Sequence, residues 1–251
     1  MPDPTWGDID PIRAAAKASA PERPKRFYKE VGLAEAEGGV VLVLDGRPAR
    51  TPGRRPLVMP AGAFAEAAAE EWRAQGETIN PATMPVTRAA NTVIDGVVDQ
   101  MEAVRDEILK YAGTDLLCYR ADNPEALCAL QTQNWDPVVD WVAQTYGHRP
   151  VLAGGVMHTP QPDALIAAIR DADFAEMEPF ALAGLYTVTV LTGSAFLALA
   201  LKRGLIDADA VWTAAHVDED WQISQWGEDE EASARRAARR IEFDAAILSL
   251  G

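Results

Sequence analysis

Residues 40–46 read Val-Val-Leu-Val-Leu-Asp-Gly, a run of β-branched residues and leucine that ends in a turn-forming pair. An Asp-Gly pair favours a type I′ turn, because both central residues of that turn need positive φ angles. The pattern predicts an antiparallel hairpin, with residues 27–36 before it and residues 47–58 as the returning strand. Prolines at positions 48, 52 and 56 of the returning strand remove backbone donors. We therefore expect that strand to be irregular or to lie at a sheet edge.

A helix is expected directly after the sheet. Phe64, Ala68 and Trp72 recur at the spacing of one helical face. Pro60 lies near the start of this pattern and Gly76 just past its end, which are the positions that these two residue types favour. The sequence therefore predicts one helix packed on the sheet.

From residue 95 onward the pattern is helical. Asp99 and Glu102 have the spacing of a capping box, which predicts a helix that ends at Gly113. Asn123-Pro124 and Asp136-Pro137 each place a capping residue before a proline, so each predicts a further helix start.

Two more helices are expected toward the C-terminus, a short one over residues 162–170 and a terminal one. The apolar spacing predicts the inner face of the terminal helix, formed by Ala234, Ala238, Ile241, Ala245 and Leu248. We expect an α+β fold with a loosely attached arm at residues 1–24, a sheet-plus-helix domain at 25–95 and an all-α bundle at 96–251.

Composition excludes several classes of protein. The 251 residues are 48% hydrophobic and 24% charged, as in an ordinary globular chain, so wholesale disorder is excluded. The net charge of −15 repels phosphate backbones, and we expect no nucleic-acid partner. The two cysteines favour a reducing compartment, and residues 1–20 show no signal or transit peptide pattern. We expect a bacterial cytoplasmic protein, or a mitochondrial matrix protein if the chain is a mature eukaryotic form.

Residues 180–201 form the longest uncharged run, 22 residues followed by Lys202 and Arg203. That length could cross a bilayer, so a membrane-associated protein is one alternative. Glycine, serine and threonine within the run lower its hydrophobicity, and a helix at the centre of a bundle is also apolar all round. We expect a buried bundle helix with a break near Gly193 and no stable membrane insertion.

The chain carries no pattern for a cofactor or a metal. The glycine pairs at 38–39 and 154–155 lack the Lys-Ser or Lys-Thr of a phosphate-binding loop, and no histidine or cysteine spacing fits zinc. We expect no catalytic residue, no cofactor and no bound metal.

The region richest in side chains that could bind or react is 205–231, which has nine acidic residues and no basic one. Glu219, Gln222, Ile223 and Trp226 share one helical face there, which indicates a contact surface. A plain solvated acidic face is the simplest alternative, since charge runs usually face water. A metal-dependent enzyme that uses residues 218–231 is the other alternative, although no calcium-loop spacing is present.

A series of short motifs runs in order from residue 26 to residue 231. They are Arg26-Phe27-Tyr28-Lys29, Leu44-Asp45-Gly46-Arg47-Pro48, Thr51-Pro52, Glu71-Trp72, Met84-Pro85-Val86-Thr87-Arg88, Asn91-Thr92, Asp95, Asn134-Trp135-Asp136-Pro137, Gly193-Ser194, Glu219, Gln222 and Trp226-Gly227. In these motifs the chain resembles the assembly chaperones of the catalytic head of the F-type ATP synthase.

The resemblance implies a small N-terminal sheet-and-helix domain joined to an orthogonal helical bundle. It implies a chaperone without enzymatic activity, which binds the free alpha subunit and shields its apolar interface until the beta subunit associates. It also implies roles for Glu230, the acidic residue shortly after the Trp-Gly pair, and for Trp72. The expected partner-binding residues are Glu230, Trp226, Glu219, Gln222 and Trp72.

Overall fold

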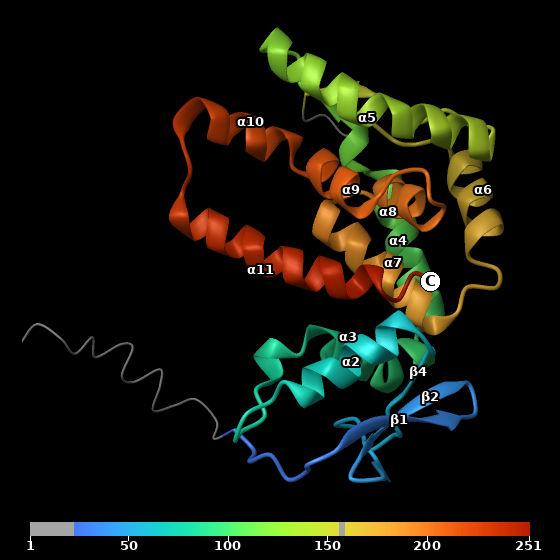
Figure 1. Ribbon diagram of the computed structural model, residues 1–251. Coiled ribbons are helices and arrows are strands. Elements are labelled where there is room, and N and C mark those ends of the chain that lie inside the picture. Colours follow the sequence, from blue (N-terminus) through green and yellow to red (C-terminus); the bar gives the residue numbers. More distant parts are fainter. Residues whose placement is uncertain (1–22, 156–158) are drawn as a thin grey trace, which may run out of the picture.

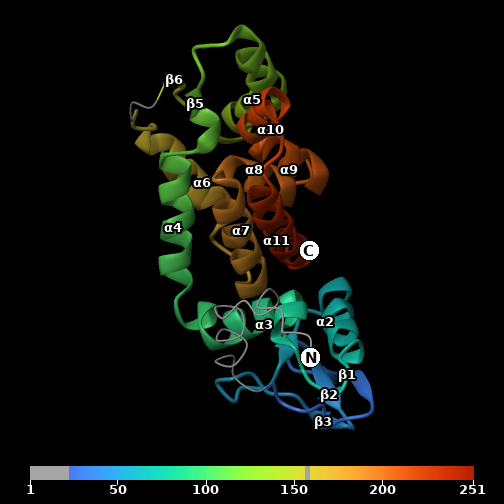
Figure 2. The same ribbon diagram turned by 90° about the vertical axis from the view of Figure 1, so that its left-hand side faces the viewer.

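The computed structural model describes residues 23–155 and 159–251 of the chain. The predicted arm, residues 1–24, lies outside the described residues except for its last two. The described chain forms two stacked units (Figures 1 and 2). The lower unit is a sheet with its helices, and the upper unit is a helical bundle.

The N-terminal sheet is built around one central strand. β2 (Gly39–Leu44) pairs antiparallel with β1 (Val31–Ala36) along its whole length, and with β3 (Arg47–Pro48) and β4 (Val58–Met59) on its other side. Asp45 and Gly46 have φ angles of 48° and 74°, so the predicted Asp-Gly hairpin turn is confirmed. The returning segment is broken into two short strands, as its prolines predicted.

The described part of the N-terminal unit has two helices rather than the one that we expected, and α2 (Ala63–Arg73) is the one that packs on the strands. α2 is the predicted helix and buries Phe64 and Ala68. α3 (Pro85–Asp95), preceded by a 3₁₀ turn at Pro81–Thr83, was missed. This unit thus has one helix more than we expected, because the first turn of α3 is completed by a residue of α2, described below.

The bundle consists of helices with one small sheet between its loops. Its helices are α4 (Met101–Gly113), α5 (Glu125–Tyr146), α6 (Asp163–Asp173), α7 (Pro179–Thr192), α8 (Ala195–Lys202), α9 (Ala208–Ala215), α10 (Val217–Trp226) and α11 (Glu230–Ile247). Two further 3₁₀ turns lie at Val97–Asp99 and Leu116–Cys118. β5 (Tyr119–Arg120) and β6 (Ala153–Gly154) pair in parallel, so this unit is not entirely helical.

One predicted helix start and one predicted helix cap were wrong, although the helix with the wrong cap ends at Gly113 as expected. Asp136-Pro137 lies inside α5, and Asp136 forms an ion pair with Arg120 at 2.7 Å. Pro137 has no N–H to donate to the carbonyl oxygen one turn earlier in the helix, but Pro137 is exposed, so that oxygen lies on the solvent side. Buried neighbours such as Trp135 keep the helix continuous. Asp99 does not cap α4, because its carboxylate pairs instead with Arg55 at 2.7 Å.

The uncharged run at 180–201 divides into α7 and α8 at Gly193, which has a φ of 71°, so the predicted break is confirmed. Ser194 then caps α8 through a hydrogen bond that its Oγ accepts from Leu197 N at 3.0 Å. Within residues 23–155 and 159–251, none of the helices combines the length and the hydropathy that a bilayer crossing requires.

The predicted inner face of the terminal helix was wrong over most of its length. Ala234, Ala238 and Ile241 are exposed, Ile241 by 54%. α11 instead turns Phe243 into the bundle core, and Ala245 on the opposite side contacts the N-terminal unit. Spacing alone cannot tell which apolar side of an alanine-rich helix faces the core.

Buried side chains fall into two clusters, one in each unit. The units meet where Phe64 packs edge-on against Phe180, with ring centroids 5.3 Å apart, and where Arg88 forms an ion pair with Glu242. We propose the boundary near residue 95 on the basis of these clusters, with Ala245 reaching across it.

Candidate functional site

α10 and α11 lie side by side at one edge of the bundle (Figure 1) and enclose an open groove of about 730 Å³. We call it the α10–α11 groove; its lining is Trp212, Glu219, Gln222, Ile223, Trp226, Gly227, Glu228, Asp229, Ala232, Ser233, Arg235, Arg236, Ala237, Arg239 and Arg240. Trp226 is 79% exposed, more than any other large hydrophobic side chain in the described part of the chain. The groove therefore offers an indole to solvent between charged walls.

Local sequence explains why the two helices form this pair. Three acidic residues, Asp218, Glu219 and Asp220, occupy the first turn of α10, where the helix dipole favours negative charge. Gly227, with a φ of 88°, ends α10, and Asp229 begins α11 by accepting a hydrogen bond from Ala232 N at 2.7 Å. A reversal of three residues, 227–229, thus places the end of α10 beside the start of α11.

Arginines of α11 fix the helix against its neighbours. Arg236 pairs with Asp220 of α10, and Arg240 pairs with Asp209 of α9 at 2.6 Å. The Arg240 guanidinium also lies 5.5 Å from the ring centre of Trp212. The hydrogen bonds that these arginines donate to the carboxylates raise the pKa of both arginines. Two carboxylates of the acidic run, Asp209 and Asp220, are therefore neutralised between helices, and Glu231 pairs along α11 with Arg235 at 2.6 Å.

His216 precedes the first residue of α10 and is buried. Burial lowers its pKa, so the ring is neutral near pH 7. Its Nδ1 lies 2.7 Å from the carbonyl oxygen of Trp212, and this contact requires the hydrogen to sit on Nδ1. Glu219 lies 4.0 Å from Nε2, beyond hydrogen-bond range, and stays more than half exposed.

The structure brings together three of the five predicted contact residues. Glu219, Gln222 and Trp226 line the groove. Glu230 is exposed in the first turn of α11 but does not line it. By helical spacing Glu230 shares the outer face of α11 with Ala234 and the exposed Ile241, which is the side turned away from Phe243.

Trp72 lies in the other unit, at the end of α2. Its ring packs against Tyr28, with centroids 5.6 Å apart, and the Tyr28 hydroxyl donates to the Trp72 carbonyl oxygen at 2.7 Å. Trp72 and Trp226 therefore belong to two separate surfaces.

The acidic residues at 218–231 do not converge on one point. Within the described residues, no group of three or more His, Cys, Asp or Glu side chains is placed to hold a metal ion. Asp218 accepts from Gln131 Nε2 at 2.8 Å, Asp220 pairs with Arg236, and Asp229 caps a helix. These carboxylates have structural partners, which is the arrangement of an ion-paired surface.

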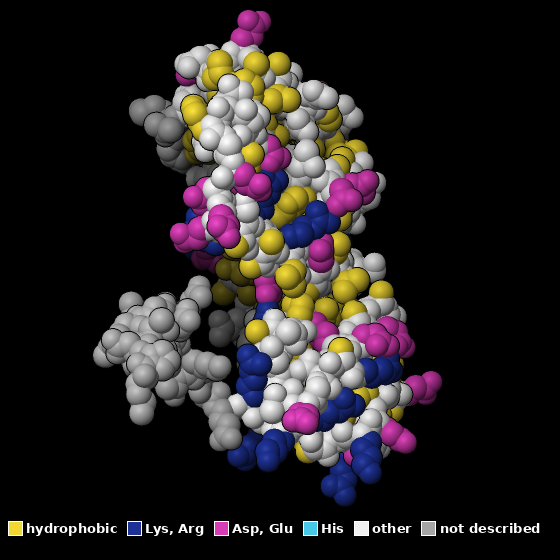
Figure 3. Space-filling model, turned by 60° about the vertical axis from the view of Figure 1, so that its left-hand side comes forward, with side chains coloured by type: hydrophobic (Ala, Val, Ile, Leu, Met, Phe, Trp, Pro, Cys, Tyr) yellow, Lys and Arg dark blue, Asp and Glu magenta, His cyan; other side chains and the backbone are white. Residues whose placement is uncertain are grey.

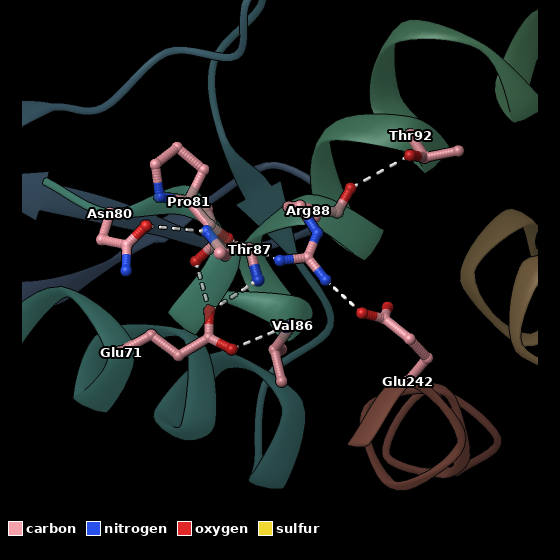
Figure 4. Close-up of polar contacts among 9 residues, drawn as sticks. Glu71, Asn80, Pro81, Val86, Thr87, Arg88, Thr92 and Glu242 are labelled. Atoms are coloured by element: carbon pink, nitrogen blue, oxygen red, sulfur yellow. Dashed lines mark hydrogen bonds and ion pairs between the residues drawn. The ribbon is translucent and has the colours of Figure 1, made fainter. Parts of the chain in front are cut away.

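Sequence reasoning missed several buried polar contacts. The Glu71 carboxylate accepts hydrogen bonds from Val86 N at 2.6 Å, from Thr87 N at 2.7 Å and from Thr87 Oγ1 at 2.7 Å (Figure 4). It thereby caps α3 from α2, although burial raises its pKa. Figure 4 also shows Arg88 directed toward Glu242 of α11, across the junction of the two units.

Other motif residues also pair with each other. Asp95 accepts from Thr51 Oγ1 at 2.6 Å and from Gly53 N at 2.8 Å, which holds the loop between β3 and β4. Asp115, which lies outside the motifs, accepts from Ser194 Oγ at 2.7 Å. The sequence offered one usable signal, a carboxylate inside an otherwise apolar stretch, since a buried charge must find donors.

Three comparisons relate this chain to known proteins. The sequence profile of a family described as "ATP12 chaperone protein" matches residues 25–143. Protein atp12 of Schizosaccharomyces pombe, which is mitochondrial, is 22% identical over 233 residues, covering 87% of this chain and 80% of that protein.

Solved structures give closer likenesses. Atp12 from Paracoccus denitrificans is 42% identical with a TM-score of 0.84, covering 90% of this chain and 97% of that one. The Atu1473 protein of Agrobacterium tumefaciens, described as a candidate chaperone, is 49% identical with a TM-score of 0.86, covering 100% of this chain and 91% of that one.

Proposed function

Since the chain belongs to the ATP12 chaperone family and is a chaperone rather than an enzyme, we propose that it assists assembly of the F-type ATP synthase by binding the free alpha subunit. In this role it shields the apolar interface of alpha until the beta subunit associates. An unassembled subunit exposes the surface that it later buries, and such surfaces aggregate.

The exposure of Trp226 is the observation that carries this proposal. Tryptophan is enriched among the residues that dominate protein–protein binding energy. Trp226 stands in an open groove, with Ile223 beside it and the carboxylate of Glu219 and the amide of Gln222 on the same helix. Figure 3 shows charged side chains of both signs around hydrophobic ones on the upper half of this face. A mixed surface of this kind suits reversible binding, because charge complementarity orients the client while a small apolar centre holds it.

We assign Trp226, Glu219 and Gln222 to direct contact with the client. Glu230 contributes from the outer face of α11, where none of the ion pairs among the described residues involves it. Trp72 contributes from the N-terminal unit, on a separate surface.

Titration of purified alpha subunit into the chaperone tests the proposal. We expect binding without nucleotide, release on addition of beta, and a loss of affinity of about tenfold or more for Trp226→Ala, or roughly 1.4 kcal/mol. Glu230→Lys should also weaken binding. Glu125→Lys is the matched control, because Glu125 is likewise an exposed acid in the first turn of a helix.

Two results would count against these assignments. No binding of alpha by the unmodified chain would refute the proposed client. Unchanged affinity of a folded Trp226→Ala variant would leave the client in place and remove the groove as its contact.

A further inference from the structure

A second groove lies on the N-terminal unit and shares no lining residue with the α10–α11 groove. It holds about 810 Å³, and its walls include Phe27, Trp72, Arg47 and Arg50. We call it the Phe27 groove. Its position in the sheet unit separates it from the bundle surface described above.

One wall of the Phe27 groove is a rigid aromatic stack. Phe27 is 72% exposed and meets the ring of Tyr28 edge-on, with centroids 5.4 Å apart. Tyr28 is buried, packs on Trp72 and is fixed by its hydroxyl hydrogen bond to the Trp72 carbonyl oxygen. An exposed ring on a fixed support loses little conformational entropy when a partner covers it, which favours binding.

The other wall is basic. Arg47 and Arg50 are exposed, and no ion pair among the described residues uses them or Arg26. The Arg26 guanidinium lies 4.6 Å from the ring centre of Tyr28 and donates to backbone carbonyl oxygens. The one carboxylate in the groove, Asp45, already accepts from Lys29 N at 3.0 Å and Glu30 N at 2.8 Å. Among the described residues, the groove thus has two arginines and one carboxylate, an excess of positive charge.

Trp72 supplies an independent sign that something is missing. Its indole Nε1 is buried and has no acceptor among the described residues. Buried donors in native proteins nearly always have a partner, because an unpaired one destabilises the fold. Because Trp72 lines the Phe27 groove, an acceptor oxygen of a bound partner is a candidate for this N–H.

We propose that the Phe27 groove docks an extended acidic segment of the client that carries one bulky apolar side chain. The apolar side chain packs on Phe27, and the carboxylates meet Arg47 and Arg50. This inference rests on the proposed function and adds the chemistry of a second contact.

The charge distribution supports two unlike contacts. Residues 25–95 hold nine basic and nine acidic residues, whereas residues 96–251 hold 11 basic and 25 acidic residues, a net charge of −14. Figure 3 shows Lys and Arg side chains gathered on the lower half of the molecule. An acidic segment is therefore repelled by the bundle unit as a whole and attracted to the basic wall of the Phe27 groove.

A photo-crosslinking amino acid at position 27, in the full chain mixed with purified alpha subunit, identifies the occupant. We expect a crosslink to an alpha peptide rich in Asp and Glu, mapped by mass spectrometry. A crosslink to a basic or uncharged alpha peptide, to residues 1–22 of the same chain, to a second copy of the chaperone, or to nothing would overturn the proposal.

Charge reversal gives the second measurement. Arg47→Glu with Arg50→Glu should lower affinity for alpha about tenfold and flatten its dependence on salt, since exposed charge attraction is screened over about 10 Å at 0.1 M salt. Arg54→Glu is the matched control, because Arg54 is an exposed arginine nearby that does not line the groove. Unchanged affinity of the folded double variant for alpha would refute the Phe27 groove as a contact and leave the proposed function in place. Failure of the unmodified chain to bind alpha would refute the proposed function and, with it, this inference.

Discussion

The side chain of Ser194 donates a hydrogen bond to the Asp115 carboxylate at 2.7 Å, although 79 residues separate the two in sequence. Asp115 is completely buried and also accepts from Phe196 N at 2.9 Å and Leu117 N at 3.1 Å. One carboxylate therefore ties the end of α4 to the first turn of α8. The break between α7 and α8 is stabilised by this contact as well as by Gly193.

Asp115 should make stability depend on pH. Burial raises its pKa to about 7 from an ordinary value of 3.8, so the folded protein keeps a proton that the unfolded chain releases between these values. The free energy of unfolding contributed by Asp115 is therefore highest below about pH 4 and falls as pH rises to about 7. Between pH 5 and pH 8 the loss is on the order of 2–3 kcal/mol.

Urea denaturation of the unmodified chain and of Asp115→Asn at pH 5 and pH 8 measures this contribution. The asparagine variant cannot ionise, so its loss of stability between the two pH values should be smaller by that amount. Equal losses in both proteins would show that Asp115 keeps an ordinary pKa in the folded state.

Local patterns predicted the parts of the fold that local physics determines. The Asp45-Gly46 turn, α2 and the break at Gly193 follow from φ preferences and spacing within a few residues. α3 was missed because Glu71, distant in sequence, completes its first turn. The exposed face of α11 was misassigned because Phe243 and the ion pairs of Arg236 and Arg240 set its rotation.

The candidate site divides in the same way. The shared face of Glu219, Gln222 and Trp226 was predictable because all three lie on one helix. The separation of Glu230 from that face and the aromatic stack around Trp72 depend on contacts between helices or between distant segments, which a single sequence does not display. The resemblance identified these residues without placing them.

Removing the cap that Glu71 supplies to α3 should destabilise the N-terminal unit. Glu71→Ala leaves Val86 N and Thr87 N without their acceptor, at an expected cost of about 2–3 kcal/mol. Glu70→Ala is the neighbouring control, because Glu70 pairs only with the exposed Arg73 and should cost less than about 0.5 kcal/mol. Chemical denaturation compares the two variants, and similar midpoints would contradict the capping role.

Gly184 should be far more sensitive to substitution than Gly113. A Cβ at Gly184 would lie 2.8 Å from the carbonyl oxygen of Ala246, so α7 and α11 must separate to admit it. We expect Gly184→Ala to cost about 1–3 kcal/mol. The same change at Gly113 meets nothing within 4 Å and should be neutral or slightly stabilising, because alanine favours helix. Thermal unfolding of both variants checks this, and an equal melting temperature would contradict the close packing of α7 on α11.

Replacement by alanine should mainly lower stability at Trp135 and mainly lower client binding at Trp226. Trp135 is 1% exposed and its Nε1 donates to the Ala214 carbonyl oxygen at 2.7 Å, so Trp135→Ala should lower the free energy of unfolding by about 3–5 kcal/mol. Trp226→Ala removes a side chain that is mostly in water and should change stability by less than about 0.5 kcal/mol while weakening client binding. Urea denaturation and alpha-subunit titration of the same preparations separate these effects. A large loss of stability in Trp226→Ala would show that this indole serves the fold, and its exposure would then no longer support a contact with the client.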